Sequence, residues 1–160
     1  MSTILITGAS RGLGIELARQ YAAAGWRVIA CARRPAAAAE LNEVADGSGG
    51  RVSVRALDVA NHGQVEELAR QLRGVPVDVL LNCAGAMGRE SFADKGMTIQ
   101  SFGQTDYDDW MHTLRVNVFG PMKMAEAFAD SVAGLRSVIA GLTPASAGRF
   151  LQWDGRELPW

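Results

Sequence analysis

Short apolar runs alternate with amphipathic or alanine-rich stretches along most of the chain. The apolar runs are four to six residues long and rich in valine, isoleucine and leucine, which is typical of strands buried inside a sheet. The predicted strands cover residues 3–6, 27–32, 52–57, 77–81 and 136–140. The predicted helices cover residues 15–24, 36–44, 62–72 and 107–132. Predicted strands and helices therefore alternate along the chain.

This alternation predicts an α/β fold, in which a doubly wound parallel sheet lies between two layers of helices. Ligands of such sheets bind beyond the carboxyl ends of the strands, where the strand order reverses. We expect one domain over residues 1–140, with the sheet ending after about five strands. Residues 141–160 fit neither a helix nor a strand period and form an atypical tail.

A glycine-rich turn, Thr-Gly-Ala-Ser-Arg-Gly-Leu-Gly over residues 7–14, joins the first strand to the first helix. Such a turn offers free backbone N–H groups and the positive end of a helix dipole to an anion. We expect Gly8 to allow a tight turn, Gly12 to leave room for a phosphate and Gly14 to let the helix approach the sheet. A pyrophosphate is the anion that fits best, and the alternative is an ordinary connection between strand and helix.

This turn resembles the cofactor fingerprint of the short-chain dehydrogenase/reductase family. The resemblance implies a Rossmann-type, three-layer fold and a bound nicotinamide dinucleotide. Residues 82–85, Asn-Cys-Ala-Gly, are similar to the family's Asn-Asn-Ala-Gly signature, and residues 58–59 resemble its pair beside the adenine. Residues 78–126 look most like the C-factor or sniffer-like branch. The implied cofactor-binding residues are Gly8, Ser10, Arg11, Gly12, Leu13, Gly14, Arg33, Asp58, Val59, Asn82, Ala84 and Gly85.

The end of the second predicted strand favours NADP over NAD. Ala32 stands where dinucleotide sites often carry an acid that binds the ribose hydroxyls. With no carboxylate to repel it, a 2′-phosphate is accepted there, and a guanidinium binds it through two hydrogen bonds. We assign Arg11 and Arg33 to that phosphate and Arg34 to the solvated surface. The alternative for the arginines is that all three are solvated surface charges. The alternative for Asp58 is that it is only a helix cap or a loop acid.

Asn117 matches the helix asparagine of the family's catalytic tetrad, which implies support for a water linked to the catalytic lysine. The alternative is a polar helix residue that bonds to the backbone. The family's Tyr-x-x-x-Lys pair is absent from this chain. Its tyrosines are Tyr21 and Tyr107, neither with a lysine four residues later, and its last lysine is Lys123.

The resemblance implies hydride transfer between NADP(H) and a small carbonyl or alcohol substrate of unknown identity. Because the tyrosine and lysine are missing, two alternatives stay open. The chain is either a non-catalytic NADP-binding module, or a fragment from a truncated or frameshifted gene. The tail after residue 140, which has two tryptophans and a proline in its last eight residues, favours the second alternative.

Charge and composition exclude several other classes. The net charge of −1 gives no electrostatic case for nucleic acid or an anionic membrane. No apolar run approaches the roughly 18 residues of a membrane span, and no signal peptide is visible, so we expect a cytoplasmic protein. Cys31 and Cys83 are predicted to be buried thiols. His62 and His112 have no partners at metal-ligand spacing, so no metal site is predicted.

The predicted helix 107–132 carries two sets of apolar residues. We expect one stripe to face the sheet and Val116, Phe119 and Met124 to face other directions. In intact relatives this helix often forms the dimer interface, and strand 136–140 would be an open sheet edge. We therefore expect a homo-oligomer. The stripe expected to face the sheet consists of Met111, Leu114, Val118, Met122, Ala125 and Ala129.

Overall fold

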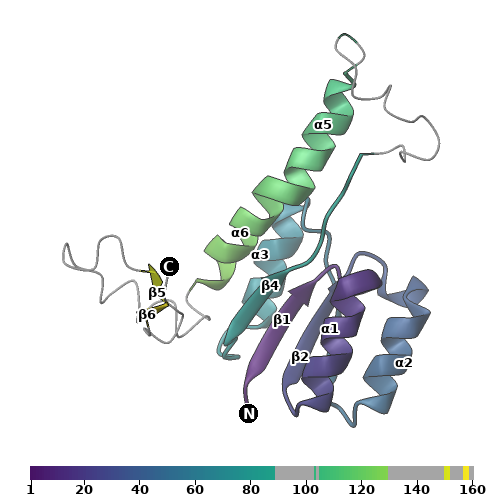
Figure 1. Cartoon of the computed structure of the whole chain (residues 1–160), viewed down its shortest axis with the longest axis vertical. Helices are drawn as coiled ribbons and strands as arrows, with labels where there is room; N and C mark the ends of the chain where they lie inside the picture. The colour runs from purple at the N-terminus through teal and green to yellow at the C-terminus, as the bar shows by residue number, and fades with distance from the viewer. Residues whose placement is uncertain (89–102, 104, 130–149, 152–156, 159–160) are drawn as a thin grey trace.

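The computed structural model describes residues 1–88, 103, 105–129, 150–151 and 157–158. Its main sheet is built from β1 (Thr3–Thr7), β2 (Arg27–Ala32), β3 (Val52–Ala56) and β4 (Val79–Asn82). All pairings are parallel, in the order β3-β2-β1-β4 (Figure 1). The predicted α/β class is confirmed. The predicted strand 136–140 lies outside the described residues.

The strand order reverses at β1, because β2 lies on one side of it and β4 on the other. Leu5 is paired with Ile29 of β2 and with Leu80 of β4. The carboxyl ends of β1 and β4 therefore meet at the point where parallel sheets bind their ligands. The glycine turn starts there.

The helices are close to the predicted ranges, with shifted ends. They are α1 (Gly12–Ala23), α2 (Ala39–Gly47), α3 (His62–Gln71), α5 (Tyr107–Leu114) and α6 (Gly120–Phe128). A 3₁₀ turn, η1 (Pro35–Ala37), precedes α2, and a π-helical segment, η3 (Arg115–Phe119), joins α5 to α6. A short antiparallel pair is formed by β5 (Phe150–Leu151) and β6 (Glu157–Leu158).

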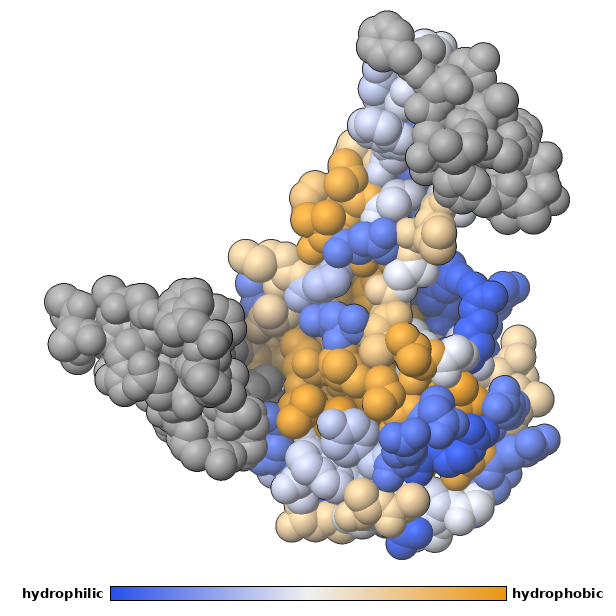
Figure 2. All heavy atoms as spheres, in the orientation of Figure 1, coloured by the Kyte–Doolittle hydropathy of each residue, from blue (hydrophilic) through white to orange (hydrophobic). Residues whose placement is uncertain are grey.

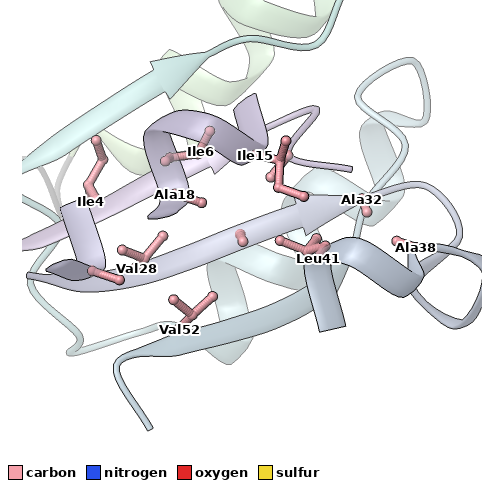
Figure 3. Close-up of a cluster of buried hydrophobic side chains, with 12 residues drawn as sticks. Ile4, Ile6, Ile15, Ala18, Val28, Ala32, Ala38, Leu41 and Val52 are labelled. Atoms are coloured by element: carbon pink, nitrogen blue, oxygen red, sulfur yellow. The ribbon is translucent and has the colours of Figure 1, made fainter. Parts of the chain in front are cut away.

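Helices cover both faces of the sheet, which explains why β1 is buried at every position and β2 at every position after Arg27. The outer strand β3 instead alternates apolar and polar residues over Val52–Arg55. Successive side chains of β1 point to opposite faces. Ile4 and Ile6 pack with residues of α1 and α2, including Ala18 and Leu41 (Figure 3). Leu5 instead joins the cluster formed with α3, η3 and α6. Two apolar layers therefore hold β1 in place.

The orientation predicted for the helix over residues 107–132 is wrong. Val116 and Met124 are buried, whereas Met111, Val118 and Met122 are exposed. The buried positions recur every fourth residue, at 116, 120, 124 and 128, and they face α3 and the sheet. Hydrophobic side chains on the other side remain in contact with solvent (Figure 2). The π-helical segment contributes to this result, because its wider turn rotates the residues that follow it relative to a continuous α-helix.

Candidate dinucleotide-binding site

The turn after β1 lies directly against the segment that follows β4. Gly8 has a φ of +66°, and a Cβ built on it would lie 2.6 Å from Ala84 Cα and 2.7 Å from Ala84 N. The amide of Ala84 also donates a hydrogen bond to the Thr7 hydroxyl, at 3.1 Å. Only glycine satisfies both the backbone conformation and the contact. Candidate residues from two distant stretches of sequence are thereby brought together.

Gly14 brings the first turn of α1 onto the glycine turn itself. A Cβ on Gly14 would overlap the Gly8 carbonyl oxygen and lie 3.0 Å from Ala9 Cα. The sequence predicted a close approach of helix and sheet at Gly14. The structure places the closest approach between the helix and the turn.

The amino-terminal end of α1 is open. Arg11 occupies the N-cap position without a side-chain capping bond, and the first turn contains no acidic residue. A Cβ on Gly12 would meet no atom within 4 Å, and Leu13 is 77% exposed. The first N–H groups of a helix need partners from outside the helix. In the described part of the chain, this helix end thus combines unpaired backbone N–H groups, the positive end of the helix dipole and free space. This combination suits a phosphate.

The end of β2, which carries two of the basic residues, is joined to this turn by a backbone hydrogen bond. The amide of Ala9 donates a hydrogen bond to the Cys31 carbonyl at 2.9 Å, which joins the turn to the end of β2. Ala32 is buried, whereas Arg33 and Arg34 are exposed. Arg11 is exposed as well. Arg11 and Arg33 therefore each follow by two residues one of the partners in the hydrogen bond that holds the turn against β2.

The loop after β3 is held by its own hydrogen bonds. The carboxylate of Asp58 accepts a bond from the Ala60 amide at 3.0 Å, and the Asp58 amide donates to the Gln64 side chain at 2.8 Å. Val59 is 5% exposed and belongs to the core. The geometry of Asp58 is that of a loop acid, and this role is compatible with an adenine beside it.

Asn117 bonds to the backbone of Ala86, just beyond the stretch 82–85. Its Nδ2 donates to the Ala86 carbonyl at 2.7 Å, and its Oδ1 accepts from the Ala86 amide at 2.8 Å. This is the arrangement expected of a polar helix residue that bonds to the backbone. It ties the π-helical segment η3 to the end of β4, next to Gly85.

Burial makes the two thiols poor nucleophiles. Cys31 is 1% exposed, and desolvation raises its pKa to about 12. Desolvation also raises the pKa of Cys83, although this side chain is partly exposed. The prediction of a buried thiol is thus confirmed for Cys31 and only partly correct for Cys83. Both sulfurs stay protonated near neutral pH, so neither is activated for chemistry.

Sequence analysis missed one residue of this region, Gly120. It is buried at the start of α6, and a Cβ built on it would lie 3.1 Å from the Cβ, Cγ2 and carbonyl oxygen of Val59. A glycine inside a helical pattern costs stability, so its presence there was a signal of close packing.

An open helix end on a glycine turn, at the reversal point of a parallel sheet, defines a protein of the Rossmann-type dinucleotide-binding class. The family model for short chain dehydrogenase matches residues 2–140, so the chain belongs to the short-chain dehydrogenase family.

Curated relatives are found in several bacteria. The chain is 28% identical to Protein FixR of Bradyrhizobium diazoefficiens over 156 residues, covering 95% of this chain and 53% of the relative. It is 31% identical to the ketoacyl reductase HetN of a Nostoc species over 136 residues, covering 83% of this chain and 47% of the relative. The chain thus spans about half the length of these relatives.

Solved structures of the same family agree with the fold. A short-chain dehydrogenase/reductase of Burkholderia multivorans with bound NADP matches with a TM-score of 0.70 and 30% identity, covering 81% of this chain and 53% of that one. A carbonyl reductase of Pseudomonas aeruginosa in complex with NADP matches with a TM-score of 0.71 and 28% identity, covering 82% of this chain and 56% of that one.

Within the described residues, every helix is too short or too polar to cross a bilayer.

Proposed function

We propose that this chain binds NADP(H) and forms the cofactor half of an oxidoreductase that transfers hydride between NADP(H) and a carbonyl or alcohol. The open amino-terminal end of α1 carries this proposal, because it offers a phosphate both donors and space. The two NADP-bound relatives of known structure support it. When bound, the reduced nicotinamide supplies the hydride. The residues of this chain would bind and orient the dinucleotide.

In this proposal each candidate residue has a limited task. The backbone of residues 8–14 receives the pyrophosphate, and Arg11 and Arg33 bind the 2′-phosphate of the adenosine. Val59 and Asp58 border the adenine. Asn82, Ala84 and Gly85 border the rest of the cofactor across the ends of β1 and β4.

A second function is favoured by one observation. The sequence has no tyrosine followed four residues later by a lysine, so this chain does not supply the family's proton relay. A non-catalytic NADP-binding module is the alternative. An NADPH-consumption assay with a panel of carbonyl compounds, run beside a binding titration, separates the two. Turnover supports the oxidoreductase and binding alone supports the module, whereas the absence of both contradicts the proposed function.

We expect NADPH to bind roughly tenfold to hundredfold more tightly than NADH, because a charge-assisted contact between guanidinium and phosphate contributes about 1.5–3 kcal/mol. Arg33→Ala should reduce this preference, as measured by calorimetric titration of both cofactors. Arg34→Ala is the matched control, since it removes a neighbouring exposed guanidinium and should leave the preference unchanged. Equal affinity of the unmodified chain for the two cofactors would contradict the assignment of NADP.

We also propose that the chain forms a homo-oligomer through the exposed side of α5, η3 and α6. Val118 and Met122 are 51% and 62% exposed, and Trp110 is 59% exposed. Large apolar side chains that are exposed in this way favour association. Val118→Lys should shift the oligomer toward monomer in light scattering across a dilution series. Ala23→Lys, at an exposed position on α1, should not. A stable monomer of the unmodified chain at high concentration would overturn this proposal.

A further inference from the structure

The start of α6 lies so close to the loop after β3 that a Cβ added to Gly120 would be crowded by Val59. Gly120 has φ −58° and ψ −57°, an ordinary helical conformation that alanine adopts readily. The backbone therefore does not require glycine at this position. The constraint comes from Val59, whose Cβ, Cγ2 and carbonyl oxygen would each lie 3.1 Å from an added Cβ, so that Val59 would have to shift by a few tenths of an ångström. Carbon atoms in favourable contact are about 3.5–4.0 Å apart.

Val59 is poorly placed to move away from an added methyl group. Its side chain is packed in the core cluster that also contains Val65 and Val116. Two hydrogen bonds fix the loop on both sides of Val59. The Ala60 amide donates to Asp58 Oδ1 at 3.0 Å, and the Asn61 amide donates to the Asp58 carbonyl at 2.9 Å. A displacement of Val59 would therefore carry the Asp58 loop with it.

Three residues earlier in the same helix, Asn117 holds a different loop. Its two hydrogen bonds to the Ala86 backbone fix the segment after β4. The segment η3 and Gly120 thus contact the loops after β3 and after β4. These loops lie on opposite sides of β1 in the sheet. In doubly wound folds the two sides of the reversal point receive the two mononucleotide halves of a dinucleotide.

We propose that η3 and Gly120 act as a two-point positioning element, in which Gly120 sets the loop that borders the adenine half and Asn117 sets the loop that borders the nicotinamide half. This inference rests on the proposed function. Gly120 and Asn117 are positioning residues in it, since each acts through the loop that it contacts. An ion pair of 2.6 Å between Lys123 of α6 and Glu66 of α3 adds to the fixed placement of α6 against the Asp58 loop.

The experiment uses two probes, NADPH and adenosine 2′,5′-bisphosphate, which contains only the adenine half. Gly120→Ala should weaken the binding of both probes by a similar factor, roughly tenfold. Asn117→Ala should lower the affinity for NADPH by a comparable factor and leave the affinity for the bisphosphate unchanged. Gly47→Ala is the matched control, because a Cβ there meets no atom within 4 Å, and it should bind both probes as the unmodified chain does. Circular dichroism and thermal unfolding follow the fold of each variant.

A double variant tests the contact itself. Val59→Ala removes the Cγ2 atom that faces the added methyl group, so Gly120→Ala combined with Val59→Ala should recover part of the affinity for the bisphosphate lost in Gly120→Ala. If Gly120→Ala alone does not fold, a double variant that folds and binds the bisphosphate as Val59→Ala does supports the contact. A double variant that also fails to fold or to bind, beside a Val59→Ala chain that binds, overturns it.

The outcomes for the inference and for the proposed function are distinct. If the unmodified chain binds neither probe, the proposed function fails. If the unmodified chain binds both probes, two results contradict the inference and leave the proposed function standing. In the first, Gly120→Ala binds both probes as tightly as the unmodified chain does. In the second, Asn117→Ala lowers the affinity for both probes by the same factor.

Discussion

Replacing Phe128 with alanine is expected to lower the free energy of unfolding by about 3–5 kcal/mol. Phe128 is fully buried at the end of α6, in the cluster that joins α6 to α3 and to Leu5 of β1. Removing the ring would leave a cavity that its neighbours, including Met124, fill only in part. Denaturation in urea, followed by circular dichroism, measures the change through the midpoint and slope of the transition.

Phe119→Ala is the matched control for this prediction. Phe119 belongs to the same helical region and is 44% exposed, so its removal should cost less than about 1 kcal/mol. A loss of similar size in the two variants would mean that α6 is not held against the sheet by its buried face. A loss of less than about 1 kcal/mol for Phe128→Ala would lead to the same conclusion.

The second large effect is expected from Gly14→Ala. An added Cβ would overlap the Gly8 carbonyl oxygen, so α1 and the glycine turn would have to move apart. Overpacking of this kind costs about 1–3 kcal/mol, and the displaced turn would no longer present its amides to a phosphate. We expect a lower Tm and, in the same variant, a loss of NADPH affinity of at least roughly tenfold.

Gly47→Ala again provides the comparison, because it adds the same methyl group to a helix where no atom lies within 4 Å. This control should retain both Tm and affinity. If Gly14→Ala kept the Tm and the NADPH affinity of the unmodified chain, the close contact between helix and turn would have no role in binding.

Much of the sheet could be predicted from the sequence, because the strands are short apolar runs between clear turn signals. The residues at 4–6 in the middle of β1 are all apolar, as is typical of a strand covered on both faces. The spacing of Gly8, Gly12 and Gly14 located the turn correctly. In each case the local sequence carries the relevant physical constraint.

The orientation of the helical stretch α5–η3–α6 could not be predicted, because two of its faces are nearly equally apolar. One face carries Met111, Val118 and Met122, and the other carries Val116 and Met124. The decisive residue, Gly120, has no hydropathy signal and acts by permitting close approach to Val59. The π-helical segment is also invisible to a pattern that assumes a uniform period of 3.6 residues. The partner of Asn117 is a backbone group 31 positions away, and no spacing rule encodes that contact.

The parallel pairing of β1 has a consequence for the order in which the sheet can assemble. Thr3 pairs with Arg27, 24 residues away, when β2 joins β1. The hydrogen bond from the Thr3 amide to the carboxylate of Asp78, the residue just before β4, spans 75 residues. Closing the longer loop costs about 1 kcal/mol more in chain entropy. During synthesis, β1 and β2 can pair while β4 is still inside the ribosome. The sheet edge formed by the carboxyl ends of β1 and β4, where the dinucleotide site lies, is therefore completed only after the central strands have paired.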